Sequence, residues 1–413
     1  WVLTVKKAEK NYFFKLEKYR DDLLKFYAQR DEGGKSYVQP EARKNEIINR
    51  IKDAKDIPIS RTGSNGWGIP VPGDESQTIY VWIDALFNYL TYVDDPGRKH
   101  YWESGATHFI AKDILWFHAA IWPAVQMALS KCDGYDWVWS DNVAANQLVY
   151  SHSYWVSESG EKMSKSLGNF LDPAAIDNYV SEFGLDALRY FLATRGPLGT
   201  TDSAFSPDLF VEVYNSDLAN TFGNSCSRVS NMIGKYFEGR VPTTGPEVCV
   251  SYQASIDPRP KQYMPPRDLG ELRNLDLESL SKDTVAFFHA VTDKLLLSVS
   301  YLAGVVYVQE VDKFIELTAP FKLAKDPDKL PEVGTILYNC AEALRIASVL
   351  LWPFIPDKCE QFWARIGFGH YAEQLKDGGR GDLAEWVKWG QLQPGTPIEK
   401  GEALFPRYQV EKK

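Results

Sequence analysis

The sequence GEKMSKSLGN occupies residues 160–169 and follows a stretch, 147–156, that favours a β-strand. Two ammonium groups, those of Lys162 and Lys165, alternate with serine hydroxyls, and a glycine lies on each side of the run. Such a loop suits a polyphosphate, because lysine, hydroxyl and backbone N–H groups all donate to phosphate oxygens. At the carboxyl end of a strand it would lie where doubly wound sheets bind ligands. A solvated turn rich in Lys and Ser is the alternative.

Upstream of this loop the sequence alternates between strand-like and helix-like patterns. The expected order is strand 78–83, helix 85–92, strand 107–110, helix 113–129 and strand 147–156. Such an alternation predicts a parallel sheet with crossover connections, the doubly wound α/β class. Before it we expect an amphipathic helix opening near residue 12, a second helix at 41–53 and a loop at 60–77.

Downstream of residue 171 the strand patterns fade. Asp172 and Pro173 are typical of a helix start, with a capping carboxylate and a proline in the first turn. Amphipathic stretches near 184–194, 208–237, 277–316 and 333–351 predict an all-α helical bundle. Residues 241–270 are rich in Pro, Ser and Thr and lack apolar periodicity, so we expect an irregular insertion there.

Composition excludes several classes of protein. The chain has 413 residues, 44% of them hydrophobic and 24% charged, and a net charge of −9, which argues against non-specific coating of nucleic acid. Its five cysteines form no Cys-x-x-Cys pair, so local spacing predicts neither a disulfide framework nor a zinc site. No apolar run approaches the ~18–20 uncharged residues of a membrane span, and no secretory leader is evident. We therefore expect a soluble intracellular protein.

The pentapeptide Lys162–Ser166 is identical to the second signature of class I aminoacyl-tRNA synthetases, and its surroundings resemble methionyl-tRNA synthetases. The resemblance runs through 67–74, 79–86, 108–114, 116–118 and 121–123 to the LFPR of 404–407. It implies the second half of a Rossmann-like doubly wound parallel sheet followed by a helical-bundle anticodon-binding domain. The implied segments are 1–75 (remainder of a connective insertion), 76–171 (catalytic domain), 172–207 (linking, stem-contacting helices) and 208–413 (anticodon-binding domain).

The activity implied by the resemblance is methionine–tRNA ligation, used in translation and its initiation. ATP with Mg²⁺ would activate methionine to methionyl-adenylate, and the aminoacyl group would pass to the 3′ end of tRNA(Met). Lys162 and Lys165 would be the catalytic phosphate contacts. Asp113 would bind the ribose, although a helix N-cap is the alternative for it. The implied ATP-binding residues are Asp113, Lys162, Met163, Ser164, Lys165 and Ser166.

The resemblance also implies a methionine pocket. An unbranched, polarizable substrate calls for an aromatic wall with one or two polar groups. Apolar fit alone discriminates by only ~1–3 kcal/mol, so sulfur–aromatic contact and a hydrogen bond from a neutral Tyr or His should contribute. Without the resemblance, Trp82 and His118 would be interpreted as core residues. The implied pocket residues are Trp82, Ala85, Tyr89, Ile114, Phe117 and His118.

For tRNA, the resemblance assigns anticodon contacts to Asn224, Arg228 and Phe321. Asn224 and Arg228 are four residues apart, so a helix would place them on one face, suited to bonding base edges. A solvated helix face is the alternative for this pair, and a buried bundle residue is the alternative for Phe321. The family usually has Trp at the position of Phe321; phenylalanine can still stack on a base but lacks the indole N–H.

Some family features are absent from the sequence. No His-Ile-Gly-His-like signature and no zinc-binding Cys cluster occur, so we expect the family's N-terminal third to be missing, any zinc site to lie outside this chain, and the fragment alone to be inactive. The missing part of the enzyme would be a partner of this chain. We otherwise expect a monomer, located in the cytoplasm or alternatively in the mitochondrial matrix. Ala111 replaces a family glycine. A synthetase for leucine, isoleucine or valine and a non-catalytic tRNA-binding paralogue remain alternatives.

Overall fold

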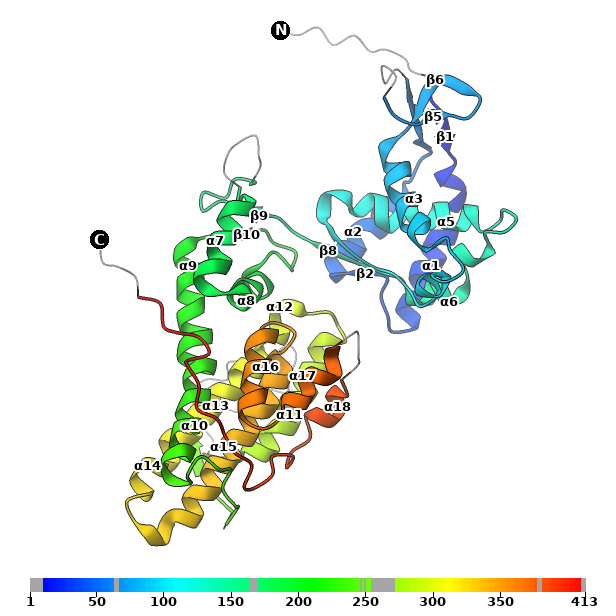
Figure 1. Ribbon diagram of the computed structural model, residues 1–413. Coiled ribbons are helices and arrows are strands. Elements are labelled where there is room, and N and C mark those ends of the chain that lie inside the picture. Colours follow the sequence, from blue (N-terminus) through cyan, green and yellow to red (C-terminus); the bar gives the residue numbers. More distant parts are fainter. Residues whose placement is uncertain are drawn as a thin grey trace. The chain divides into compact units, whose positions relative to one another are not determined.

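A computed structural model describes residues 10–62, 67–163, 170–245, 247–248, 250–253, 272–376 and 381–409. The chain divides into two compact units, which Figure 1 shows coloured along the sequence. Unit 1 comprises Trp1–Tyr154 and Pro197–Asp202, and unit 2 comprises Trp155–Gly196 and Ser203–Lys413. The four functional segments expected from the sequence are finer than these units, and their boundaries stay predictions.

Unit 1 contains the predicted parallel sheet. Its three strands are β2 (Val38–Gln39), β8 (Leu148–His152) and β7 (Thr107–Ala111), in the order β2-β8-β7, and both pairings are parallel. The predicted strands at 107–110 and 147–156 are thus confirmed, although the second ends at His152. Two further residues of that stretch form β9 (Trp155–Val156), which pairs with β10 (Ser203–Ala204) in unit 2.

Helices pack on this sheet and bury one apolar core. The predicted helices at 41–53 and 85–92 are confirmed, while the first helix begins at Arg20, later than expected, after a short strand and a 3₁₀ turn. The helical elements of unit 1 are the 3₁₀ turn Leu16–Tyr19, α1 (Arg20–Glu32), α2 (Glu41–Lys52), α3 (Val81–Val93), α4 (Lys99–Glu103), the 3₁₀ turn Lys112–Ile114, the π-helical turn Phe117–Ile121, α5 (Trp122–Leu129), the 3₁₀ turn Asp136–Val138 and α6 (Asp141–Asn146).

Two expectations for residues 60–83 are wrong. The predicted buried strand at 78–83 ends at Ile79, because the following residues open α3, whose buried Leu86, Leu90 and Val93 recur at helical spacing. The predicted loop at 60–77 instead contains an antiparallel three-stranded sheet, in the order β4-β6-β5. The strands are β4 (Ser60–Thr62), β5 (Pro70–Val71) and β6 (Asp74–Ile79), with a separate pair formed by β1 (Phe13–Phe14) and β3 (Ile57–Pro58).

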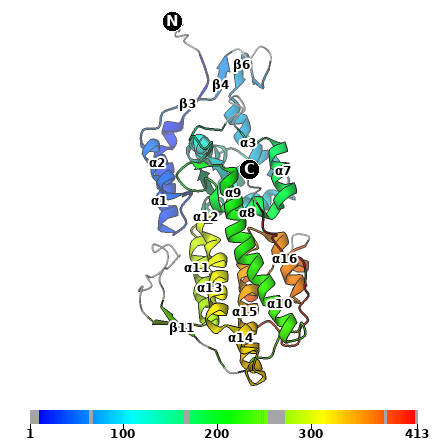
Figure 2. The ribbon, with the colours of Figure 1, turned by 90° about the vertical axis from the view of Figure 1, so that its left-hand side faces the viewer.

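Unit 2 is mainly helical, as predicted. Asp172 caps α7, and its carboxylate accepts a hydrogen bond from the Ala175 N–H at 2.7 Å. Figure 2 shows α10, α13 and α15 running side by side. The helical elements are α7 (Pro173–Phe183), α8 (Leu185–Arg195), α9 (Pro207–Val213), the π-helical segment Tyr214–Gly223, α10 (Asn224–Tyr236), α11 (Leu277–Thr292), α12 (Leu297–Ser300), α13 (Leu302–Thr318), α14 (Pro320–Leu323), the 3₁₀ turn Pro327–Lys329, α15 (Leu330–Leu351), α16 (Pro356–Arg365), α17 (Gly369–Leu375) and α18 (Leu383–Trp386).

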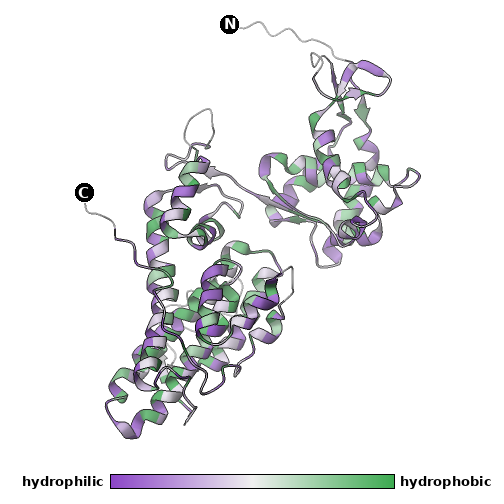
Figure 3. Ribbon diagram, viewed as in Figure 1, coloured by the Kyte–Doolittle hydropathy of each residue, from purple (hydrophilic) through white to green (hydrophobic). Residues whose placement is uncertain are grey.

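The longest helix, α15, is the centre of this unit. Residues 327–351 are long and apolar enough to cross a membrane by length and composition, the one such helix among the described residues, but 94% of the apolar window is buried inside the protein. This is the burial expected of a core helix. Figure 3 shows the surrounding helices carrying both hydrophobic and hydrophilic positions, as helices at the edge of a core do.

The expected irregular insertion at 241–270 is partly regular. β11 (Val250–Gln253) pairs antiparallel with β12 (Leu272–Leu275), so a short strand exists where the Pro, Ser and Thr content predicted none. Residues 254–270 lie outside the described residues. The strand pair explains the error, because strand pairing is satisfied by backbone groups and needs no apolar periodicity at so short a length.

Candidate active site

Two helical elements of unit 1 supply an aromatic cluster. Trp82 and Tyr89 lie on α3, seven residues apart, and Phe117 and His118 lie in the π-helical turn that follows β7. Two buried tyrosines hold this turn: the Tyr37 hydroxyl donates to the His118 carbonyl at 3.0 Å, and the Tyr27 hydroxyl donates to the Ala119 carbonyl at 2.7 Å. Single π-helical turns occur frequently at functional sites, because the widened turn re-aims its side chains.

The Trp82 and Phe117 rings form the apolar wall of the cluster. Their centroids are 4.3 Å apart and their planes differ by 15°, a stacked arrangement. An apolar pocket of about 150 Å³ opens beside this pair. It is lined by Ile57, Pro58, Arg61, Tyr80, Trp82, Ile83, Trp116, Phe117 and Ile121. The cluster thus offers flat aromatic surface to an apolar ligand.

Tyr89 and His118 add a polar group to the cluster. The Tyr89 hydroxyl lies 2.8 Å from His118 Nε2, and His118 Nδ1 lies 3.1 Å from the Ile114 carbonyl oxygen. A carbonyl only accepts, so Nδ1–H donates to Ile114. Burial lowers the pKa of His118, although the bond to Ile114 opposes that shift, so the ring is neutral at pH 7. Nε2 therefore accepts the Tyr89 proton, and the phenol oxygen keeps only lone pairs for a ligand.

His108 lies behind this pair and was not among the residues selected from the sequence. It stands on β7, its ring centroid 4.6 Å from that of Tyr89 and 5.6 Å from that of His118. Its Nε2 is buried and has no hydrogen-bond partner. Burial, aided by the nearby His118, lowers the pKa of His108 to about 4. The sequence carried one signal for it, a histidine in the predicted strand 107–110, and such a histidine is more often a plain core residue.

The depressed pKa of His108 predicts a loss of stability in acid. Between pH 6.5 and pH 4 the unfolded chain binds a proton on this ring that the folded chain does not. The free energy of unfolding therefore keeps its full value above pH 6.5 and decreases as the pH falls towards 4. At ~1.4 kcal/mol per pH unit, the decrease amounts to about 2 kcal/mol at pH 5. Urea unfolding at pH 7.5 and pH 5 should show a correspondingly smaller loss in His108→Gln than in the wild type. An equal loss in both proteins would contradict the assignment.

A polar cluster occupies the carboxyl ends of β7 and β8. Asp113 follows β7, and Tyr154, which follows β8, hydrogen-bonds to its carboxylate; burial first and Asp113 second raise the pKa of Tyr154 to about 12. Lys112 Nζ lies 2.7 Å from an Asp202 carboxylate oxygen, and that bond lowers the pKa of Asp202. Asp113 caps no helix, so the alternative interpretation of it is wrong. The parallel strands β7 and β8 bring Lys112, Asp113 and Tyr154 together at the edge where such sheets bind ligands.

The structure also describes the remaining residues of unit 1 that the sequence analysis selected. Ala85 is exposed on α3, and Ile114 contributes its carbonyl to His118. Ala111 has φ −79° and ψ 156°, an extended conformation that any residue adopts, so the substitution for a family glycine causes no backbone strain. Sequence reasoning missed Tyr154 and Asp202: the first lies inside the predicted strand 147–156, two residues beyond the observed end of β8, whereas no sequence signal joins Asp202 to a lysine so far from it along the chain.

In unit 2 the described part of the signature pentapeptide is short. Lys162 forms an isolated antiparallel bridge with Val156, and Met163 packs on the apolar core of this unit. Ser164, Lys165 and Ser166 lie outside the described residues. The predicted roles of the pentapeptide in phosphate binding therefore stay predictions.

The three predicted anticodon residues lie on helices of unit 2. Asn224, exposed, and Arg228, partly exposed, are four residues apart at the start of α10. Arg228 lies 3.8 Å from the Asp312 carboxylate, which also accepts a 2.7 Å bond from Ser225. Phe321, on α14, is 42% exposed, so it is not the buried bundle residue of the alternative interpretation. A ring so exposed can stack on an unpaired base.

Comparison with known proteins shows the family of the chain. The family model described as tRNA synthetases class I (M) matches residues 3–230. The methionine–tRNA ligase of Caldanaerobacter subterraneus subsp. tengcongensis is 37% identical over 98% of this chain and 56% of its own length. That of Bacillus subtilis is 36% identical over 98% and 54%, and that of Streptomyces coelicolor is 35% identical over 97% and 67%. The chain thus spans about half the length of the first of these relatives.

Solved structures show the same likeness. Mycobacterium tuberculosis methionyl-tRNA synthetase in complex with methionyl-adenylate superposes with a TM-score of 0.74 at 29% identity, covering 97% of this chain and 69% of that one. Its apo form gives a TM-score of 0.71 at 27% identity, with the same coverage. With a family model that matches more than half of the chain, these findings establish that the protein belongs to the methionyl group of class I tRNA synthetases.

Proposed function

We propose that the chain is part of a methionine–tRNA ligase, which activates methionine with ATP and transfers it to tRNA(Met). The observation that carries the proposal is the aromatic cluster of Trp82, Phe117, Tyr89 and His118, built on a fold shared with a synthetase solved with methionyl-adenylate. The names and titles of the relatives support the same reaction class.

The aromatic cluster would bind the methionine side chain. A flexible thioether fits a flat apolar wall, and sulfur–aromatic contact is worth ~0.3–1.5 kcal/mol. The Tyr89 proton is directed at His118, so the hydrogen bond from a neutral Tyr to the sulfur is not available in this arrangement. Selectivity would then rest on the rings and on pocket shape.

The reaction would proceed in two steps without a covalent enzyme intermediate. The methionine carboxylate attacks the α-phosphate of ATP, a P–O bond forms, and the bond to pyrophosphate breaks. Asp113 would hold the ribose, Lys162 and Lys165 would stabilise charge on the leaving pyrophosphate, and Mg²⁺ would accompany the ATP phosphates. A tRNA 3′-end hydroxyl then displaces AMP. Asn224, Arg228 and Phe321 would contact the anticodon.

Trp82→Ala tests the pocket in the full-length protein. Losing the stacked indole removes apolar contact surface, worth ~1.5–3 kcal/mol for a buried side chain. In methionine-dependent pyrophosphate exchange we expect kcat/KM for methionine to fall by a factor of about 10 to 100, while the KM for ATP changes little.

Trp82→Phe should recover part of this loss, because the ring can still stack on Phe117. Val81→Ala is the matched control, since Val81 immediately precedes Trp82 but is 64% exposed. If Trp82→Ala and Val81→Ala exchanged pyrophosphate alike, the pocket would not be the methionine site.

A further inference from the structure

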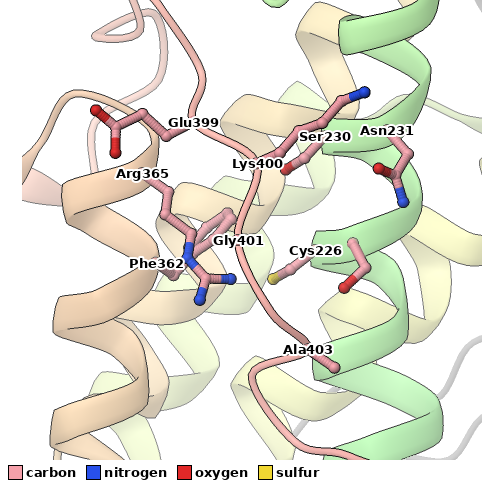
Figure 4. Close-up of a pocket in the computed structure, with 10 residues that line it drawn as sticks. Cys226, Ser230, Asn231, Phe362, Arg365, Glu399, Lys400, Gly401 and Ala403 are labelled. Atoms are coloured by element: carbon pink, nitrogen blue, oxygen red, sulfur yellow. The ribbon is translucent and has the colours of Figure 1, made fainter.

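A second cavity, of about 200 Å³, lies within unit 2 and has no part in the reaction described above. Figure 4 shows it between α10, α16 and the C-terminal segment 399–403, which we call the strap. The lining residues are Cys226, Ser227, Ser230, Asn231, Phe362, Arg365, Glu399, Lys400, Gly401 and Ala403. Pockets for whole drug-sized ligands begin at roughly 300 Å³, so this one suits a small group.

Hydrogen-bond donors dominate the cavity. Among the described residues, the side chains of Ser230, Asn231 and Lys400 have no hydrogen-bond or ion-pair partner. Arg365 donates one bond, from Nη1 to the Glu402 carbonyl at 2.8 Å, and keeps its other N–H groups. Figure 4 shows Lys400 crossing toward α10, whereas the Glu399 carboxylate points away from α10. The open donors therefore include two cations.

Two glycines allow these two cationic side chains to pack closely against backbone. A Cβ on Gly401 would lie 2.4 Å from Arg365 Cζ, so the guanidinium rests directly against strap backbone, and a larger residue there would displace it. A Cβ on Gly234 would lie 2.6 Å from Lys400 Cε, so the lysine stem lies over bare α10 backbone. Each cation is thus packed in place by an element distant from it in sequence, rather than extended into solvent.

We propose that this cavity binds a phosphate group, and specifically a backbone phosphate of the tRNA. Phosphate oxygens accept hydrogen bonds from guanidinium, ammonium, hydroxyl and amide N–H groups. Among the described residues, no group of three or more His, Cys, Asp or Glu side chains gathers here to hold a metal ion. Ser227 and Asn231 follow Asn224 by three and seven residues, so the cavity adjoins the α10 face predicted to contact the anticodon. The assignment of this phosphate to tRNA rests on the proposed function.

The test compares Lys400→Ala with the wild type in the full-length protein. We expect the Kd for methionine tRNA to rise about two- to fivefold and the slope of log Kd against log salt to fall by about one. Lys400→Arg should restore both quantities. Lys282→Ala removes the same charge from an exposed lysine on α11 and should change neither. Methionine-dependent pyrophosphate exchange should be unchanged in all three variants.

Two further results separate the possible outcomes. Calorimetric titration measures the binding of inorganic phosphate. If Lys400→Ala lost this binding while its tRNA binding was unaffected, the cavity would be a phosphate site whose occupant is a free phosphate. Unchanged binding of both tRNA and phosphate in Lys400→Ala would overturn the site. A wild-type protein that binds no tRNA would instead contradict the proposed function, a failure visible before any variant is made.

Discussion

Replacing Lys165 by alanine should lower the rate of methionyl-adenylate formation by a factor of about 10² to 10³ while changing the KM for ATP by no more than about threefold. The ammonium group is proposed to meet charge that develops on the leaving pyrophosphate, an interaction realised in the transition state more than in the bound substrate. One preorganised donor at such a position typically accounts for a loss of this size. Single-turnover adenylate formation in the full-length protein measures it without interference from product release.

Lys162→Ala is the informative comparison, because the bridge between Lys162 and Val156 is a backbone pairing that the substitution leaves in place. Any loss therefore reports the ammonium group, and we expect it to be smaller than the loss in Lys165→Ala. Lys282→Ala, a surface lysine of unit 2, is the control for loss of charge alone. An Lys165→Ala enzyme with the wild-type adenylation rate would remove this lysine from the mechanism. If the substitution raised only the KM for ATP, Lys165 would instead be a group that binds ATP in the ground state.

Glu342→Gln should destabilise unit 2 by about 3–5 kcal/mol. Glu342 and Arg345 form an ion pair at 2.8 Å on α15, and both side chains are fully buried. The carboxylate also accepts bonds from three backbone N–H groups, those of Gly390, Gln391 and Leu392. The amide keeps the shape but removes the charge, which leaves the Arg345 guanidinium buried without a counter-ion.

Urea unfolding followed by a signal from unit 2 measures this loss. Glu373→Gln, the same change at an exposed position of α17, should alter the free energy of unfolding by less than about 0.5 kcal/mol. Glu342→Met, which also removes the acceptor of the three backbone N–H groups, should be less stable than Glu342→Gln. A Glu342→Gln protein within 1 kcal/mol of the wild type would show that the pair is not essential to the C-terminal segment.

Local chemistry made part of the fold predictable. The Asp172 cap, the spacing of apolar residues in α3 and the strand character of β7 are all properties of neighbouring residues, and each was predicted. Strand β2 is only two residues long and joins the sheet through backbone bonds to β8, so no periodicity could reveal it. Residues 80–83 were misassigned because β-branched and aromatic side chains fit both a strand and the first turn of a buried helix.

The candidate site shows the same division. Resemblance selected Trp82, Phe117 and His118, and the structure joins their rings. It could not indicate that the Tyr89 proton goes to His118, since that depends on a carbonyl oxygen four residues before the histidine. The bond between Asp113 and Tyr154 and the donor cavity around Lys400 likewise unite residues far apart in sequence, which only folding brings together.

Amino-acid-dependent pyrophosphate exchange by the full-length wild-type protein tests the central claim most directly. With ATP and Mg²⁺ present, methionine, norleucine, leucine, isoleucine and valine are compared by kcat/KM. The proposed function predicts the highest value for methionine, with norleucine next because it keeps the unbranched shape but lacks the sulfur that contacts the rings. A higher value for leucine, isoleucine or valine, or no exchange with methionine, would contradict it.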